Sequence, residues 1–247
     1  MQGAERPPTR WTHATTDLHN FGLITWAVDP DLVQRLLPDG FTVDIRAGQA
    51  LVSMVPFLDH RFRFRAVPLA ALSCGQVNYR TYVRLREESG VWFFGTSLDS
   101  RLVSLPRLAW RMPWHRTRIR LDASWEGDDC RSWRLDASGA WGAATVALRG
   151  VGTPMRVVAG CEGDAMSQVL CDPYIGWYAR SDGSGVGRYS VWHEPLVLEE
   201  ALVDEARVEV LTDLGLIEDG QPPLAAGVQR MVGFDIHTPP VQIPAST

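Results

Sequence analysis

The sequence predicts a mainly β fold (α+β), either a sandwich or a barrel, with two or three short helices. Short segments rich in β-branched and aromatic residues follow one another at roughly 8–12-residue spacing, which is typical of such folds. Only two or three segments have helical periodicity. No low-complexity linker or internal repeat divides the chain. We therefore expect a single domain over residues 13–240, a disordered segment at 1–12 and a flexible tail at 241–247.

The first part of the chain predicts a strand, a short helix and two more strands. Leu18 to Val28 is aromatic and β-branched and stops at Asp29-Pro30. Asp29 suits an N-cap and Pro30 suits the first helical position. Apolar residues at helical spacing follow until Pro38-Asp39-Gly40 ends the helix. Further strands are expected at Phe41 to Ile45 and Ala50 to Leu58.

The clearest hairpin in the sequence covers residues 76–98. From Gln76 to Arg86 the side chains alternate, and Asn78, Arg80 and Tyr82 fall on the more polar face. Successive side chains of a strand point to opposite faces of the sheet. Glu87 to Gly90 turns the chain back. Because this strand should be central, Arg80 is expected to be buried.

The second half continues the pattern of short strands. A helix is predicted from Asp99 or Ser100 to Trp110, and Met112-Pro113 ends it. The other expected elements are strands at 116–121, 132–136, 143–148, 189–210 (broken at Pro195) and 227–234, helical turns at 163–171 and 212–216, and a glycine-rich loop at 181–187.

Composition excludes several classes of protein. The net charge of −5 argues against general nucleic-acid binding. All 24 basic residues are Arg, so no lysine side chain can form a Schiff base. The chain has no apolar run of ~18 residues and no signal-peptide core, which predicts a cytoplasmic protein without a membrane partner. No metal-binding motif occurs, so we expect no metal and no cofactor. The sequence leaves open a homo-oligomer.

Several runs of residues carry a family resemblance. The most specific are Asn78-Tyr79-Arg80-Thr81-Tyr82-Val83 and Gly90-Val91-Trp92-Phe93-Phe94. Further runs are Trp26 to Pro30 together with Leu37 to Phe41, Met112 to His115, and Trp192 to Leu196. Over most of residues 18–235 the sequence resembles the YqjF-like bacterial family, which is grouped with the acetoacetate-decarboxylase-like superfamily.

That resemblance implies a β-barrel with a central, largely apolar cavity. The founding enzymes of the superfamily decarboxylate β-keto acids through a lysine Schiff base, which this lysine-free chain cannot form. The family usually has a charged Glu-Arg-Tyr-like run where this chain has Ile175-Gly176-Trp177-Tyr178. The cavity wall is therefore expected to be more apolar here, and the substrate to differ.

Three residues are predicted to be catalytic: Arg80, His115 and Tyr82. A buried Arg must be paired or bind an anion. Arg80 therefore forms either an internal salt bridge, for which Asp99 is a candidate, or a clamp for a carboxylate, an enolate or a β-dicarbonyl. Tyr82 and its same-face neighbour Asn78 can donate a hydrogen bond to a carbonyl oxygen. His115 has the chemistry of a general acid or base, although a rim histidine without a role is an equal reading.

The remaining candidates would line the substrate pocket. His193 and Glu194 are consecutive, so at most one of them faces inward. Aromatic residues in strands are mostly core, yet several of them around a barrel would form a flat-walled apolar pocket. The predicted substrate-binding residues are Asn78, Trp26, Trp92, Phe94, Trp177, Tyr178 and His193.

The sequence thus predicts a small-molecule enzyme that binds an apolar carbonyl- or carboxylate-bearing substrate. Cyclase, isomerase, dehydratase or lyase chemistry fits, because each can proceed by positioning and polarisation. A cyclase in natural-product biosynthesis is one version of this hypothesis. The alternative is a non-catalytic carrier or sensor of an apolar ligand.

Overall fold

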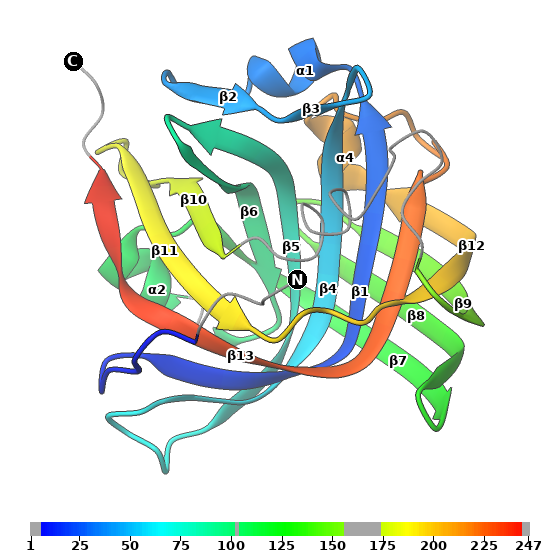
Figure 1. Ribbon diagram of the computed structural model, residues 1–247, viewed down its shortest axis with the longest axis horizontal. Coiled ribbons are helices and arrows are strands. Elements are labelled where there is room, and N and C mark those ends of the chain that lie inside the picture. Colours follow the sequence, from blue (N-terminus) through cyan, green and yellow to red (C-terminus); the bar gives the residue numbers. More distant parts are fainter. Residues whose placement is uncertain (1–5, 102–103, 156–173, 244–247) are drawn as a thin grey trace.

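The computed structural model describes residues 6–101, 104–155 and 174–243, and most of them lie in strands (Figure 1). The first half contains β1 (Ala14–Val28), α1 (Pro30–Gln34), β2 (Phe41–Val43), β3 (Ile45–Arg46), β4 (Gln49–Phe64), β5 (Leu72–Leu85), β6 (Glu88–Leu98) and α2 (Ser104–Trp110). The second half contains β7 (Trp114–Glu126), β8 (Asp129–Gly139), β9 (Ala144–Pro154), β10 (Ile175–Ala179), β11 (Val186–His193), β12 (Glu199–Val208), α4 (Glu209–Asp213) and β13 (Ala225–Ile243). The predicted mainly β fold with short helices is confirmed.

Strand pairing closes a ring. In order around it, β1 pairs with β4, β4 with β5, β5 with β6, β6 with β10, β10 with β11, β11 with β13, and β13 with β1 again (Figure 1). All these pairs are antiparallel except β6 with β10. Each ring strand therefore has one face toward the inside of the ring and one face toward the outside.

A second layer lies outside part of the ring. It consists of β7, β8, β9 and β12, which connect to the ring through β6 at one end and β13 at the other. A large apolar core fills the space between this layer and the outer faces of β1, β4 and β5. Trp26, Tyr79 and Trp133 are among its buried side chains.

A separate apolar cluster occupies the inside of the ring. It combines inward side chains of the ring strands, such as Leu23, Val55, Phe93 and Tyr178, with Met112 just after α2. A third, smaller cluster packs against the outside of β6 and β10 and is covered by β2. The inner cluster, which surrounds Arg80, defines the region where a site can form.

The local sequence signals explain several element boundaries. The side chain of Asp29 accepts a hydrogen bond from the backbone N–H of Asp31 at 2.9 Å, which is the predicted N-cap of α1. At Asn20 the backbone has φ of 51°, and the pairing of β1 with β4 shifts register between His19 and Ile24. This bulge changes which side chains of β1 face inward, so Leu18 and Phe21 both join the inner cluster.

Some boundaries differ from the expectations. The strand β10 is absent from the sequence prediction, because five residues ending in a turn give little alternation. The helix expected at 163–171 lies outside the described residues. Within the N-terminal segment, Arg6 forms an ion pair with Asp235 at 2.7 Å, and β13 continues to Ile243. No helix in the described part of the chain has the length and apolar character needed to cross a membrane.

Candidate functional site

The alternation of β5 places Asn78, Arg80 and Tyr82 on the inner face of the ring. The register pairs Arg80 with Ser53 of β4 on one side and with Phe93 of β6 on the other. Residues directly opposite each other in an antiparallel pair share a face of the sheet. Only 9% of the surface of Arg80 is exposed, so its guanidinium is held inside the ring and not in bulk solvent.

A chain of hydroxyl groups runs across the inner face beside Arg80. The hydroxyl of Ser53 lies 2.8 Å from that of Thr25 and 2.9 Å from the phenol of Tyr82. The guanidinium carbon of Arg80 lies 5.6 Å from the centre of the Tyr82 ring, within the range of a cation–π contact. These contacts fix the Tyr82 ring and orient its hydroxyl away from bulk water.

The amide of Asn78 is also oriented by its neighbours. Its Oδ1 accepts hydrogen bonds from the Thr96 hydroxyl at 2.8 Å and from the Gln76 amide at 2.9 Å. The NH2 group of Asn78 is then the part of the amide that can donate to a ligand oxygen. Asn78 keeps partial solvent accessibility, in contrast to the fully buried residues on either side of it.

Three aromatic side chains form a wall near Arg80. The ring of Tyr189 on β11 stacks against Phe93 with centroids 5.8 Å apart and lies 6.4 Å from the ring of Tyr178. Burial raises the pKa of the Tyr189 phenol, and the positive charge of Arg80 acts in the opposite direction. Tyr189 nevertheless keeps some accessible surface. The Tyr189 phenol is therefore desolvated but not completely covered by its neighbours.

The sequence analysis does not single out Tyr189 as a site residue. Its inward direction follows from the register of β11. Tyr189 and His193 are an even number of residues apart, so their side chains lie on the same face of the strand. A signal is present in the glycines around it. A Cβ on Gly176 would lie 2.6 Å from Phe93 and 3.1 Å from Tyr189, so the glycine makes room for these rings.

His193 also faces the inside of the ring, from the end of β11. It is 2% exposed, and its ring stacks against Phe234 at 4.4 Å and against Tyr174 at 5.4 Å. Its Nδ1 lies 2.7 Å from the backbone carbonyl oxygen of Glu194. Burial lowers the pKa of His193, and the nearby charge of Arg80 lowers it further. Of the consecutive pair His193 and Glu194, the histidine is the buried member.

The other catalytic candidate, His115, lies on the opposite side of β5. It is on β7, opposite Ser97, and its ring stacks on Trp141 at 4.0 Å. Trp141 in turn meets Tyr79 edge-on at 5.3 Å, in the core outside the ring. The structure does not bring His115 to Arg80, because the β5–β6 sheet separates them.

Four of the predicted pocket residues also point outward. Trp26 is fully buried in the core outside the ring, and its indole N–H donates to the carbonyl oxygen of Gln221 at 3.0 Å. Trp92 and Trp177 pack with Phe41 in the cluster under β2, and Phe94 packs against the outer clusters. Strand alternation explains the error, since the neighbours Phe93 and Tyr178 face inward instead.

Asp99 is not placed to pair with Arg80. The backbone N–H of Asp99 bonds to Gly75, five residues along β5 from Arg80. At about 3.3 Å per strand residue this separates the two positions by roughly 16 Å. The Asp99 carboxylate is exposed and lies 3.4 Å from the backbone N–H of Ile119, which is its donor. The salt-bridge alternative with Asp99 is therefore wrong.

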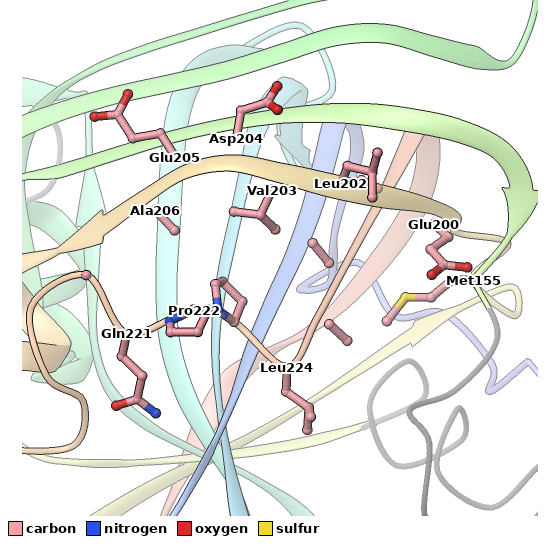
Figure 2. A pocket seen from close by; sticks show the side chains of 15 residues that line it. Met155, Glu200, Leu202, Val203, Asp204, Glu205, Ala206, Gln221, Pro222 and Leu224 are labelled. Atoms are coloured by element: carbon pink, nitrogen blue, oxygen red, sulfur yellow. The ribbon is translucent and has the colours of Figure 1, made fainter.

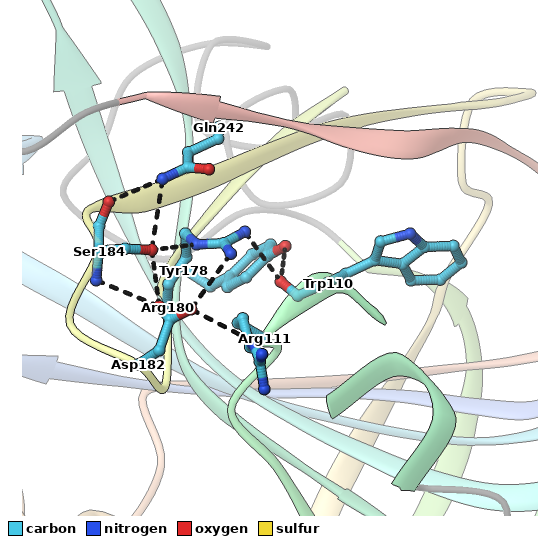
Figure 3. Close-up of polar contacts among 7 residues, drawn as sticks. All are labelled: Trp110, Arg111, Tyr178, Arg180, Asp182, Ser184 and Gln242. Carbon is cyan, nitrogen blue, oxygen red and sulfur yellow. Dashed lines mark hydrogen bonds and ion pairs between the residues drawn. The ribbon is translucent and has the colours of Figure 1, made fainter. Parts of the chain in front are cut away.

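A polar network holds the end of α2 next to Tyr178 (Figure 3). The Tyr178 hydroxyl donates to the carbonyl oxygen of Trp110 at 2.9 Å, and Arg180 donates to the same oxygen at 3.4 Å. Arg180 also donates to Ser184 at 2.7 Å and pairs with Asp182 at 3.3 Å. Burial raises the pKa of Tyr178 to about 12, so its hydroxyl stays protonated as a donor.

A groove of about 650 Å³ lies elsewhere, between β12 and residues 220–226 (Figure 2). Its described lining includes Glu200, Leu202, Pro222 and Leu224, and no Arg or His. Anion recognition and proton transfer need groups such as the side chains of Arg and His. We therefore place the candidate site at Arg80 and not in this groove.

Comparison with known proteins gives the family and the fold. Residues 15–230 match the DUF2071 family, which is described as an uncharacterized conserved protein. The chain is 28% identical over 152 residues to the uncharacterized protein YqjF of Bacillus subtilis strain 168. That match covers 60% of this chain and 60% of YqjF, so it spans less than two thirds of the relative's length.

Solved structures with similar folds are enzymes by their names. An acetoacetate decarboxylase-like enzyme from Sphingomonas wittichii RW1 has a TM-score of 0.65 at 11% identity and covers 99% of both chains. Acetoacetate decarboxylase from Legionella pneumophila has a TM-score of 0.64 at 12% identity, covering 98% of this chain and 96% of that chain.

A third structure is the enduracididine biosynthesis enzyme MppR, complexed with the condensation product of pyruvate and imidazole 4-carboxaldehyde. Its TM-score is 0.65 at 11% identity, covering 98% of this chain and 92% of that chain. At such identity these similarities establish the fold alone. They confirm the predicted acetoacetate-decarboxylase-like fold. The chain belongs to the DUF2071 family and has an acetoacetate-decarboxylase-like fold.

Proposed function

We propose that the chain is a small-molecule enzyme whose substrate is an apolar compound with a carbonyl or carboxylate group. In this proposal Arg80 contacts that group inside the ring. The observation that carries it is a buried guanidinium on the inner face of a closed ring, surrounded by aromatic side chains. A guanidinium has five N–H donors, so a contact within the protein leaves donors for a ligand.

The fold neighbours support a small carbonyl compound as the substrate class. MppR is complexed with a condensation product of pyruvate, a small keto acid. The chemistry of Arg80 agrees, because a guanidinium binds carboxylates with two parallel hydrogen bonds and stabilises negative charge on an enolate oxygen. The proposal does not use a Schiff base, since the chain has no lysine.

The residues around Arg80 would position the substrate. Asn78 offers an amide NH2 group, and Tyr82 offers a hydroxyl already oriented by Ser53. Phe93, Tyr178 and Tyr189 would pack against the apolar body of the molecule. Positioning and polarisation of this kind suffice for a cyclase, isomerase, dehydratase or lyase, including one in natural-product biosynthesis.

The second candidate function is a carrier or sensor that binds the same class of ligand without turnover. The apolar character of the inner cluster favours it, because apolar walls bind a ligand without acting on it. The two functions differ in turnover, while both need Arg80 for affinity.

The test compares an aryl keto acid with its neutral relative. We would measure binding of 4-oxo-4-phenylbutanoate and of its methyl ester by calorimetry to the wild type, Arg80→Gln and Arg188→Gln. Arg188 is the matched control, because it lies on the outside of β11 and pairs with Glu88 at 2.7 Å. Loss of charge-assisted hydrogen bonds predicts about 10- to 100-fold weaker acid binding in Arg80→Gln.

Only the acid should respond to the Arg80→Gln change, and Arg188→Gln should bind both compounds like the wild type. Equal affinity of the acid for wild type and Arg80→Gln would show that Arg80 is not the anchor. Mass spectrometry then separates the enzyme from the carrier. Conversion of the bound acid or ester to a new product identifies an enzyme.

A further inference from the structure

We propose that His193 is the residue that moves a proton to and from the substrate held by Arg80. This inference rests on the proposed function and names its acid–base group. His193 lies on the inner face of the ring at the end of β11, and Tyr189 lies on the same face of the same strand. His193 is 2% exposed. His115, the other histidine considered, lies on the opposite side of β5 from Arg80.

The contacts of His193 fix its tautomer. A backbone carbonyl oxygen can only accept a hydrogen bond, so the 2.7 Å contact with Glu194 requires a proton on Nδ1. In the neutral ring Nε2 then carries the lone pair and is the basic nitrogen. The stacked rings of Phe234 and Tyr174 hold the imidazole plane. In our proposal the edge with Nε2 is the edge that meets the substrate.

The surroundings of His193 keep its ring neutral, so that the ring can accept a proton. Burial lowers the pKa of His193, the hydrogen bond to the Glu194 carbonyl acts in the opposite direction, and the positive charge of Arg80 lowers the pKa further, so the ring is neutral at pH 7. A carboxylate or enolate bound to Arg80 would offset the charge that opposes protonation. The base is thus strengthened when the substrate is in place. Tyr189 is another titratable group near Arg80, and burial keeps its phenol protonated.

The proton transfer balances without a further reactant. Nε2 of His193 takes the proton from a carbon next to the substrate carbonyl. The electron pair of that C–H bond forms the C=C bond of an enolate, and the carbonyl π pair moves to the carbonyl oxygen. When the proton on Nε2 is replaced by one from solvent, its delivery to the same carbon gives hydrogen exchange, and delivery of a proton to another carbon gives isomerisation. No electron leaves the substrate, so no oxidant is needed.

The first test follows exchange of hydrogen for deuterium. 4-Oxo-4-phenylbutanoate is incubated in D2O with wild type, His193→Asn or His115→Asn, and the CH2 signal beside the ketone is followed by proton NMR. The amide NH2 group that His193→Asn introduces can still donate to the Glu194 carbonyl, so the variant removes the basic nitrogen while it keeps the local contact. Loss of a general base predicts an exchange rate lower by about 100-fold or more in His193→Asn.

His115→Asn should exchange the probe at the wild-type rate, and binding of the probe should change little in either variant. Equal exchange by wild type and His193→Asn overturns the inference. Partial recovery of exchange when imidazole is added to His193→Ala supports it, because a purely structural role would not be rescued in this way.

The second test does not depend on the probe. Nitrogen-15 NMR of the imidazole should show a proton on Nδ1, and the midpoint of its titration should move to higher pH in Arg80→Gln. His60 on β4 provides the control resonance in the same sample. A proton on Nε2 would overturn the inference about His193, and so would a titration midpoint that is the same in the wild type and in Arg80→Gln. Failure of the probe to bind, with both NMR results as expected, counts against the proposed substrate class alone.

Discussion

Asp59 is a buried carboxyl group with few polar partners. It is 7% exposed, and Thr16 donates a hydrogen bond to its Oδ1 at 2.9 Å. Burial raises the pKa of Asp59 to about 6, against the opposing effect of the Thr16 hydrogen bond. The native state therefore favours the protonated form, which differs from the unfolded chain.

The linkage between this pKa and stability has a definite sign. Because the pKa of Asp59 is higher in the folded state than in the unfolded state, Asp59 contributes most to the stability of the folded state below about pH 4. This contribution is lost as the pH rises through about 6. We expect Asp59→Asn to be more stable than the wild type by about 1–3 kcal/mol at pH 8 and equal to it near pH 4. Urea unfolding at the two pH values measures the difference.

The control for Asp59→Asn is Asp122→Asn. Asp122 is exposed on β7 and pairs with Arg120 at 2.6 Å, so its removal should leave the pH dependence unchanged. A gain in stability for Asp59→Asn that is the same at pH 4 and pH 8 would contradict the assignment of the effect to ionisation.

Within β10, Gly176 is required by the rings that it faces. A methyl group there would meet Phe93 and Tyr189 at 2.6 Å and 3.1 Å, and both rings are confined by stacking. We expect Gly176→Ala to lower the free energy of unfolding by about 1–3 kcal/mol through overpacking. It should also weaken binding of 4-oxo-4-phenylbutanoate, measured by calorimetry.

A glycine with open space is the matched control. In β13 a Cβ on Gly233 would have Asp17 at 3.8 Å as its contact, so Gly233→Ala should fold and bind like the wild type. If both alanine variants lose the same stability, the loss comes from the strand backbone and not from the rings of the site.

The turn between β10 and β11 holds α2 in place. Arg180 reaches the last carbonyl of α2 at Trp110, and Arg111 pairs with Asp182 at 3.2 Å. The hydrogen bond from Ser184 lowers the pKa of Asp182 to about 2, so this carboxylate stays charged across the usual pH range. We expect Arg180→Ala to speed amide hydrogen exchange in α2 by about several-fold, measured by mass spectrometry.

Exchange in β7 and β8 should be unaffected by Arg180→Ala, because the network does not reach them. Arg188→Ala serves as the control, since its ion pair with Glu88 joins β11 to β6 and does not contact α2. Unchanged exchange in α2 after Arg180→Ala would mean that apolar packing holds the helix.

The inner face of β5 can be predicted from the sequence because that strand alternates over eleven residues. Asn78, Arg80 and Tyr82 therefore fall together in the pattern, and the structure places them on one face. Most strands can also be found, since turn residues separate them. The hairpin and the capped helix α1 need only local rules.

The side of the ring cannot be predicted for the aromatic residues. Both faces of β6 and β10 are buried, one inside the ring and one under β2, so hydrophobicity does not distinguish Trp92 from Phe93 or Trp177 from Tyr178. The register shift between β5 and β6 near Phe94 adds to the difficulty. The prediction for His115 fails because only the tertiary pairing of β7 shows which face it occupies.

On the scale of the whole molecule, the absence of lysine makes a direct prediction. Incubation with pyruvate or acetoacetate and then with borohydride should leave no reduced adduct on any internal side chain, because none carries a primary amine. Intact mass and peptide mapping by mass spectrometry measure this. An adduct at an internal peptide would contradict the proposal that carbonyl chemistry here is non-covalent.

Closure of the ring joins segments from opposite ends of the chain. Ala14 in β1 pairs with Ile236 in β13, about 220 residues later, and β13 also pairs with β11 and β12. Contacts so distant in sequence make folding slow, since the entropy of bringing the ends together is lost before the pairs form. During synthesis, the edge of β1 that pairs with β13 stays open until β13 has been made, so the nascent chain is exposed to aggregation for longer than a helical protein of this size.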